Sequence, residues 1–312
     1  MPISFNADLY YHKLEQNASI FLFLGILLIK IVRFGVFFVT NHTDLAVECY
    51  ESGEKTTLNG VKVTEKNNLT IVEVLNDDGA KSIGKPVGKY VVLDIRSFVN
   101  DADVLDDRLY EFVNVLKDVL PRNISSALVV GLGNKKITAD SLGPSAMSFV
   151  LATRHIADDL KNDVGLPSLF PVSCVNTGVL GDTGIETAEI IKGIVEQIKP
   201  SCVIAVDALA ASSADRLGTT IQFSDSGISP GSGVGNHRHE ISQKTLGVPV
   251  VAIGIPTVVS TGIISGNNSD TAFVTPREID KLCRQGAKLI GMGINVCLQD
   301  NMSVKDLLAL VG

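Results

Sequence analysis

The sequence predicts an α/β fold, a three-layer sandwich in which helices cover both faces of a mostly parallel sheet. Strand and helix patterns alternate along most of the chain, which is typical of this class. Two expected strands, Ala127–Gly131 and Cys202–Val206, are apolar throughout, as in strands that are buried on both faces. The chain has 312 residues, of which 45% are hydrophobic, so it can bury a large core.

The individual elements follow from the spacing of the apolar residues. The expected strands are Leu69–Leu75, Tyr90–Ile95, Ala127–Gly131, Phe170–Val175, Cys202–Val206, Thr219–Phe223 and Val248–Ile255. The expected helices are Val104–Leu120, Leu142–Leu160, Thr187–Ile198 and Pro276–Leu298. No repeat or low-complexity linker divides residues 45–312, so we expect one domain there.

The first 44 residues differ in composition from the rest of the chain. They hold six of the 12 phenylalanines and the longest apolar run, Ile20–Ile29. Lys30 and Arg33 follow this run after ten residues, whereas a membrane span needs about 20. The pattern of a secretory signal is missing as well. We therefore expect residues 1–44 to be a detachable leader; a membrane anchor and a start codon assigned too far upstream are the alternatives.

Charge and cysteine content limit the possible partners. The formal net charge is −7, so the chain lacks the overall basic field that favours direct nucleic-acid binding. The five cysteines are widely spaced and form no CxxC pair, which argues against a disulfide framework and a structural zinc site. These features indicate a reducing compartment such as the cytoplasm.

Several common motifs are absent. Gly131-Leu132-Gly133 follows a strand, but Lys136 stands where a dinucleotide fingerprint needs its third glycine. The glycine-dense segment Gly231–Gly235 lacks the lysine of a phosphate-binding loop, so it is either a substrate-facing loop or a simple turn. The chain contains neither a G-x-S-x-G elbow nor an HExxH motif.

Two carboxylates remain as candidates for catalysis. Asp207 follows the apolar strand Cys202–Val206, and ligands of open α/β sheets bind at the carboxyl ends of strands. Asp140 follows the strand Ala127–Gly131 through a short loop and opens a helix, where it could equally be a plain N-cap. If the two carboxyls converge, burial and mutual repulsion keep one protonated and one ionised, which suits the activation of water for peptide hydrolysis.

A series of ordered blocks between Thr43 and Val259 resembles the germination protease of spore-forming bacteria. The blocks are Gly131–Asn134 with Thr138 and Asp140, Leu142–Pro144, Thr153–His155, Gly184–Ile191, Ile204–Ala210, Gly231–Asn236 and Gly254–Val259. The resemblance implies an endopeptidase that degrades small acid-soluble spore proteins, is made as a zymogen, forms a homotetramer and acts in the spore core. It also implies a fold similar to that of hydrogenase maturation endopeptidases.

The family is described as an atypical aspartic protease, although it has also been grouped with metallopeptidases. Its two catalytic aspartates fall on Asp140 and Asp207. We expect no cofactor and no metal, because the candidate ligands His155, His237 and His239 are better explained as helix-face or loop residues. The residues that we expect to line the substrate cleft are Gly133, Asn134, Glu186, Gly231, Ser232 and Gly233.

The resemblance also suggests a role for the leader. Substrates of the family are cut after an acidic residue that precedes a bulky apolar residue and alanine, and Asp44-Leu45-Ala46 has this form. We therefore expect self-cleavage between Asp44 and Leu45. Two alternatives stay open: a metal-dependent maturation-type peptidase on the same fold, and a membrane-tethered binding protein without catalysis.

Overall fold

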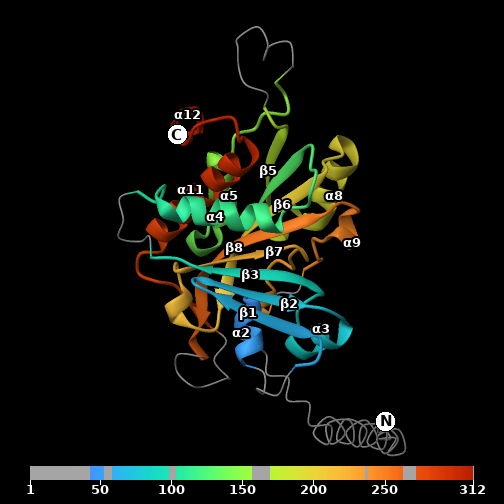
Figure 1. Ribbon diagram of the computed structural model, residues 1–312, viewed down its shortest axis with the longest axis vertical. Helices are drawn as coiled ribbons and strands as arrows, with labels where there is room; N and C mark the ends of the chain where they lie inside the picture. Colours follow the sequence, from blue (N-terminus) through green and yellow to red (C-terminus); the bar gives the residue numbers. More distant parts are fainter. Residues whose placement is uncertain are drawn as a thin grey trace, which may run out of the picture. The chain divides into compact units, whose positions relative to one another are not determined.

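The computed structural model describes residues 43–52, 58–97, 103–156, 169–235, 238–262 and 272–311. The chain divides into two units, Met1–Thr40 and Asn41–Gly312, and all described residues belong to the second unit (Figure 1). Of the predicted leader, residues 1–42 lie outside the described part, and so does His237. Within the described part, no helix is both long and apolar enough to cross a bilayer.

One large sheet organises the described unit. Its strands follow the order β1-β2-β3-β7-β8-β6-β4-β5, and β9 pairs with β8. Strands β4, β5, β6 and β8 are mutually parallel, whereas β1, β2, β3 and β7 extend the sheet in antiparallel fashion. The bounds are β1 Val61–Lys66, β2 Leu69–Val74, β3 Gly88–Asp94, β4 Ala127–Leu132, β5 Val172–Gly178, β6 Cys202–Ala211, β7 Thr220–Ser224, β8 Val250–Ser260 and β9 Phe273–Val274.

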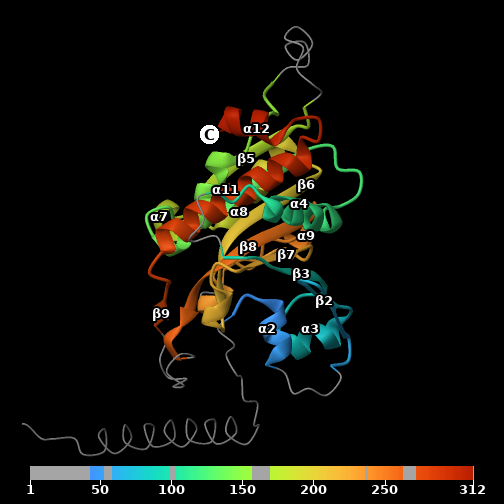
Figure 2. The same ribbon diagram turned by 60° about the vertical axis from the view of Figure 1, so that its left-hand side comes forward.

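Helices cover both faces of the sheet. On one face lie α4 (Asp107–Val119), α5 (Leu142–Ala146) and α11 (Ile279–Leu298), and Figure 2 shows α4 and α11 on the same side of the sheet. The apolar sides of these helices share a core with β4, β6 and β8. On the other face, α8 (Thr187–Ile198) packs on β4 and β6, beside α9 (Gln243–Leu246). The short helix α2 (Ala46–Glu51) packs on β2 and β3. The other α-helices among the described residues are α3 (Asp77–Ile83), α7 (Leu180–Thr183) and α12 (Val304–Val311).

Successive side chains of β6 point alternately to the two faces of the sheet, and this determines which helical layer each one contacts. Cys202, Ile204 and Val206 belong to the core under α4 and α11, while Val203 and Ala205 belong to the core under α8. Because successive side chains of a strand point to opposite faces, Asp207 continues the row of Val203 and Ala205. The buried strand thus delivers one carboxyl to the α8 side of the sheet.

The α/β class with helices on both faces is confirmed, and α8 has the predicted bounds. The predicted helix Leu142–Leu160 is wrong: α5 ends at Ala146, and a 3₁₀ turn covers Met147–Phe149. The chain then continues without regular secondary structure, and the Thr153 and Arg154 N–H groups both donate to the Val172 carbonyl at 2.9 and 3.0 Å. Residues 157–160 of that prediction lie outside the described part.

The predicted end of strand Cys202–Val206 is also too early. Strand β6 continues to Ala211, and Asp207 lies within it, because β8 keeps pairing with β6 as far as Ala211 and Val259. The neighbour on the other side, β4, pairs with β6 only up to Val206. From Asp207 onward, β6 therefore has an edge that β4 does not cover.

Candidate active site

Asp207 is a deeply buried carboxyl at the point where β4 stops covering β6. Its side chain is 4% exposed, and its Oδ1 accepts a hydrogen bond of 2.9 Å from the Ala208 N–H. Burial raises the pKa of Asp207 well above its usual range, and the negative charges of Asp140 and Asp44 raise it further. Asp207 is therefore protonated under conditions where an ordinary aspartate is ionised.

Asp140 reaches the same cavity from the loop that follows β4. It ends a 3₁₀ turn, Thr138–Asp140, and its Oδ2 accepts a hydrogen bond of 2.8 Å from the Asn134 N–H. Gly133 has a positive φ of 107°, and a Cβ at this position would collide with the backbone and the carboxyl of Asp140. The Thr257 hydroxyl of β8 donates to the Ala139 carbonyl at 2.7 Å and fixes the turn from the other side.

The two aspartates differ in environment. Burial raises the pKa of Asp140 as well, but the hydrogen bond from Asn134 and the positive charge of Arg238 oppose this shift. Asp207 is more deeply buried and is held further toward its neutral form. This difference favours a protonated Asp207 beside an ionised Asp140, an arrangement suited to acid–base chemistry on a bound water.

Both carboxyls line one cavity of about 240 Å³. The other lining residues are Asp44, Leu132, Gly133, Ile137, Ala139, Gly178, Val179, Thr187, Ala208, Leu209, Ala210, Pro230, Gly231, Val234, Arg238, Thr257 and Val258. Strands β4, β5, β6 and β8 therefore bring their carboxyl ends together here, as expected for an α/β sheet.

Arg238 is a site residue that the sequence analysis missed. It lines the cavity, and its charge lowers the pKa of both Asp140 and Asp207. Its Nη1 atom is buried without a hydrogen-bond partner among the described residues. The sequence signal for Arg238 is its position shortly after the glycine-dense segment Gly231–Gly235, which the sequence predicts to be either a substrate-facing loop or a simple turn.

Asp44 occupies the uncovered edge of β6 next to the two aspartates. Its backbone N–H donates to the Ala210 carbonyl at 2.8 Å, as an added strand would. Its carboxylate accepts hydrogen bonds from the Ala210 N–H at 2.9 Å, the Gly233 N–H at 2.8 Å and the Ser232 hydroxyl at 2.6 Å. We call these three donors of Ala210, Ser232 and Gly233 the acid-binding cradle.

The side-chain amide of Gln222, on β7, forms hydrogen bonds with the main chain on both sides of the Asp44–Leu45 peptide bond. The Gln222 Nε2 donates to the Asp44 carbonyl oxygen at 3.0 Å, and its Oε1 accepts from the Ala46 N–H at 2.7 Å. Leu45 and Ala46 are fully buried in a core that also contains Leu209. The predicted cleavage junction is thus an ordered part of the site.

The other predicted cleft residues are placed as follows. Gly133 and Gly231 line the cavity, and Ser232 and Gly233 hold the carboxylate of Asp44. Asn134 contacts Asp140 through its backbone. Glu186 precedes α8 and has a buried Oε2 without a described partner, and the residue that lines the cavity at this point is Thr187.

The described residues contain no group of three or more His, Cys, Asp and Glu side chains that could hold a metal ion. His155 and His239 are exposed. The described groups around this small cavity supply the three carboxyls of Asp44, Asp140 and Asp207 and the guanidinium of Arg238.

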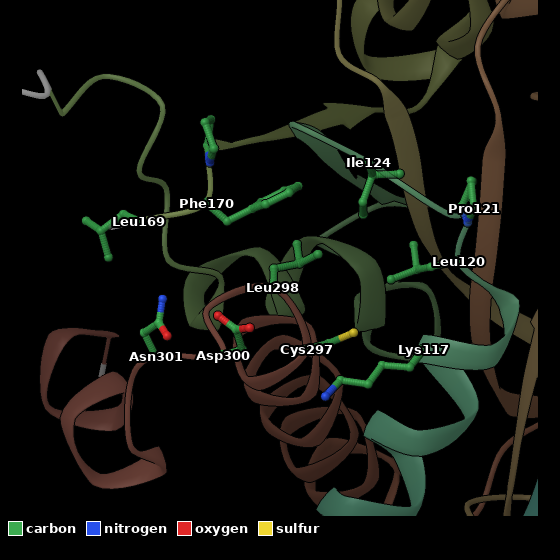
Figure 3. Close-up of a pocket in the computed structure, with 11 residues that line it drawn as sticks. Lys117, Leu120, Pro121, Ile124, Leu169, Phe170, Cys297, Leu298, Asp300 and Asn301 are labelled. Atoms are coloured by element: carbon green, nitrogen blue, oxygen red, sulfur yellow. The ribbon is translucent and has the colours of Figure 1, made fainter. Parts of the chain in front are cut away.

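A second hollow lies at the opposite, amino ends of β4 and β5. It has a volume of about 460 Å³ and is lined by side chains of α4, α11 and the segment before β5, including Lys117, Phe170 and Cys297 (Figure 3). Burial raises the pKa of the Cys297 thiol to about 11, so this cysteine is not a reactive thiolate at neutral pH.

Comparison with known proteins places the chain in a family. A family model described as germination protease matches residues 41–273. The chain is 37% identical to the germination protease of Clostridium perfringens, over 85% of this chain and 97% of the relative. It is 43% identical to that of Bacillus cytotoxicus, over 73% of this chain and 65% of the relative.

Among solved structures, a NiFe hydrogenase maturation protease, HycI from Thermococcus kodakarensis, is similar with a TM-score of 0.36 and 19% identity. The match covers 58% of this chain and 99% of that one. The family model and the curated relatives agree over most of the sequence. This chain belongs to the germination protease family.

Proposed function

We propose that this protein is an endopeptidase that starts the degradation of small acid-soluble spore proteins during germination, and that it is made as a zymogen that cuts its own chain between Asp44 and Leu45. One observation carries the proposal. The acidic residue of the predicted junction is seated beside the buried carboxyl of Asp207 and the half-buried carboxyl of Asp140, with its side chain in the acid-binding cradle.

In the proposed mechanism, Asp140 and Asp207 act on one water molecule. Ionised Asp140 takes a proton from the water, whose oxygen attacks the carbonyl carbon of the acidic residue, while protonated Asp207 gives its proton to the carbonyl oxygen. When the tetrahedral intermediate collapses, Asp140 passes its proton to the leaving nitrogen and Asp207 recovers its own. Peptide and water are consumed, and a carboxyl and an amine are formed.

Asp44 supports a specificity for acidic residues before the cut. Three hydrogen-bond donors converge on its carboxylate, and two of them are backbone N–H groups that cannot rotate away. Bonds from such donors to an ionised group are stronger than those between neutral groups. After release of the leader, the same donors are free to bind an acidic side chain of a substrate.

The family resemblance extends the proposal to the setting of the enzyme. We infer a homotetramer that acts in the spore core, without a metal ion or another cofactor and without direct nucleic-acid binding. The leader is removed in the active form, and membrane contact through it is not part of the proposed function.

The proposal is tested with the full chain and two single variants, Asp140→Asn and Asp207→Asn. Each is incubated with a peptide that contains Asp-Leu-Ala or Glu-Leu-Ala, and the products and the mass of the protein's own N-terminus are recorded. Loss of one acid–base group is expected to slow both reactions by about 10²–10⁴-fold. Rates close to wild type in either variant would contradict the two-carboxyl mechanism.

Asp182→Asn is the matched control. Asp182 is a carboxylate on α7 that pairs with Lys136 at 3.2 Å and does not line the cavity. The Asp182→Asn variant should leave the rates of peptide cleavage and of self-cleavage unchanged. A thermal melt of every variant separates lost chemistry from lost folding.

A further inference from the structure

Glu48 is a buried carboxylate one helical turn after the junction, and the proposed chemistry does not use it. It is 3% exposed and lies in α2. It accepts hydrogen bonds from the Ser212 N–H at 2.6 Å and the Ser213 N–H at 3.1 Å, and it pairs with the Arg216 Nε at 3.3 Å. A charge at this depth is costly unless it is fully partnered.

The remaining partner of Glu48 comes from the leader. The Thr43 hydroxyl donates a short hydrogen bond to Glu48 Oε2. The same hydroxyl accepts from the Leu45 N–H at 3.1 Å. The Leu45 nitrogen is thus linked to the Glu48 carboxylate through a single hydroxyl group, and that group belongs to a residue upstream of the junction.

Hydrolysis of the Asp44–Leu45 bond would change both ends of this link. The reaction consumes one water, leaves a carboxyl on Asp44, and turns the Leu45 N–H into an amine that takes up a proton to become an ammonium. Thr43 departs with the leader, so Glu48 loses one hydrogen-bond donor. Leu45 and Ala46 are fully buried in the core with Val72 and Leu209, which keeps the new end of the chain in place.

We propose that Glu48 is the binding site for the α-ammonium of Leu45 once the leader is gone, so that the new N-terminus takes the place of the Thr43 hydroxyl. The proposal rests on the proposed function, because it concerns the product of self-cleavage. The ion pair fixes the new end of the chain beside α2. The acid-binding cradle, which Asp44 has vacated, is then open to a substrate.

The charges around Glu48 favour an added cation. Arg216 is shared by three carboxylates: Glu48, Glu51 at 3.0 Å and Asp94 at 3.9 Å. Two further cations lie near the junction. Lys85 donates from its Nζ to the Thr43 carbonyl at 3.3 Å and loses that acceptor with the leader, and Arg238 lines the cavity together with Asp44.

Further titratable groups near the junction include the carboxyls of Asp44, Asp140 and Asp207 on the cavity side and the thiol of Cys49 in α2. Asp44 departs with the leader, and burial raises the pKa of Cys49, which keeps its thiol neutral. An ammonium beside Glu48 therefore adds a second full cation to a cluster in which carboxylates are in excess.

The test generates a protein whose N-terminal residue is Leu45 without relying on self-cleavage. In the full chain, residues 40–44 are replaced by Asp-Asp-Asp-Asp-Lys, after which enteropeptidase cuts the folded protein before Leu45. The cut protein is treated with limiting acetic anhydride from pH 6 to 9, and mass spectrometry of the N-terminal peptide gives the rate of acetylation. Only the uncharged amine reacts, so the dependence of this rate on pH reports the pKa of the α-amino group.

A partner carboxylate raises the pKa of an ammonium by about one unit or more. At any pH below the raised pKa, this lowers the fraction of uncharged amine by about tenfold. We therefore expect Leu45 to be acetylated about tenfold more slowly in the parent than in Glu48→Gln. Glu51→Gln is the matched control, because it removes an exposed carboxylate that shares Arg216 from the same helix, and its rate should equal that of the parent. Equal rates in the parent and Glu48→Gln would overturn the proposal.

A second variant keeps Glu48 and moves the ammonium instead. One glycine inserted before Leu45 displaces the new end by up to about 3.8 Å and should abolish the slow acetylation. Continued slow acetylation would also overturn the proposal. Failure of self-cleavage is seen separately, as an uncut wild-type chain, and leaves this test unaffected.

Discussion

Gln222 and Asp207 lie in one row across three neighbouring strands and point to the same face of the sheet. Gly254 of β8 is in register with Gln222 of β7 on one side and with Asp207 of β6 on the other. Because Gly254 has no side chain, Leu209 can lie over it, and a Cβ there would be 2.5 Å from the Leu209 Cγ. The amide that holds the Asp44–Leu45 bond thus belongs to the face that carries the buried acid.

Replacing Gln222 by alanine should slow self-cleavage about tenfold or more. The variant removes the donor to the Asp44 carbonyl oxygen and the acceptor of the Ala46 N–H. A buried polar group left without its partner loses about 1–3 kcal/mol, and a carbonyl oxygen gains charge during hydrolysis. The measurement is the mass of the N-terminus over time.

Gln299→Ala is the control for this variant. Gln299 is equally buried, but its amide bonds to the backbone of Phe170, away from the cavity. It should lower thermal stability without changing the cleavage rate well below the melting temperature. Cleavage of Gln222→Ala at the wild-type rate would show that the amide only packs the junction.

Gly233→Ala should block both self-cleavage and the cutting of acidic peptides. A Cβ at this position would collide with the Asp44 carboxylate and come within 2.8 Å of the Ala210 Cβ, so the acidic side chain could not enter the acid-binding cradle. In peptide assays the loss should be a higher KM for substrates with Asp or Glu before the cut. Steady-state kinetics on a matched pair of peptides, with Glu or Gln at that position, measures it.

Gly193→Ala provides the matched control. Gly193 lies in α8, and a Cβ there would meet no atom within 4 Å. Alanine also favours the helix by about 1 kcal/mol relative to glycine. The control should be slightly more stable and fully active, and unchanged acidic preference in Gly233→Ala would remove the acid-binding cradle from the specificity argument.

The sequence predicts those elements whose signals are local. Helix α8 has the expected bounds because its amphipathic pattern lies between Gly184 and Lys199, which both adopt the left-handed conformation that ends a helix. Strand β6 is longer than expected because Ala208–Ala211 carry little strand preference of their own, and pairing with β8 decides their conformation. Helix α5 is shorter than expected because a 3₁₀ turn follows it at Met147–Phe149, and Thr153, within the predicted helix, bonds instead to Val172 at the start of β5.

For the candidate site, sequence patterns identify the acids and tertiary contacts add their partners. Asp140 and Asp207 each follow an apolar strand, so their neighbourhood at one edge of the sheet can be expected. Neither Gln222 nor Arg238 follows an apolar strand in this way. The role of Gln222 depends on register across β7, β8 and β6, and the one local signal for Arg238 is its position after the glycine-dense segment Gly231–Gly235. The link from Leu45 through Thr43 to Glu48 likewise exists only after the junction packs on β6.

Treatment with a chelator should leave peptide cleavage unchanged. Once Asp44 has left with the leader, the described lining of the cavity keeps the two carboxyls of Asp140 and Asp207 and the Arg238 guanidinium, and an adjacent guanidinium disfavours a divalent cation. The assay compares enzyme dialysed against EDTA with enzyme supplied with Zn²⁺, Mn²⁺ or Co²⁺. Activity that disappears on dialysis and returns with one ion would instead support the metal-dependent alternative.

Arg238→Met should shift the pH profile of cleavage toward higher pH. The Arg238 charge lowers the pKa of both Asp140 and Asp207, so its loss raises both. The acid limb, where Asp140 becomes protonated, and the alkaline limb, where Asp207 becomes ionised, should therefore move in the same direction. Values of kcat/KM, measured between pH 4 and 9, report this shift.

Arg154→Met is the appropriate comparison for this shift, because Arg154 is an exposed arginine outside the cavity lining. If the profile of Arg238→Met only falls in height, Arg238 binds substrate without tuning the acids. If the two limbs move apart, only one of the acids responds to its charge. If both limbs of the Arg238→Met profile move to higher pH and those of Arg154→Met do not, then one guanidinium acts on two carboxyls in the same cavity.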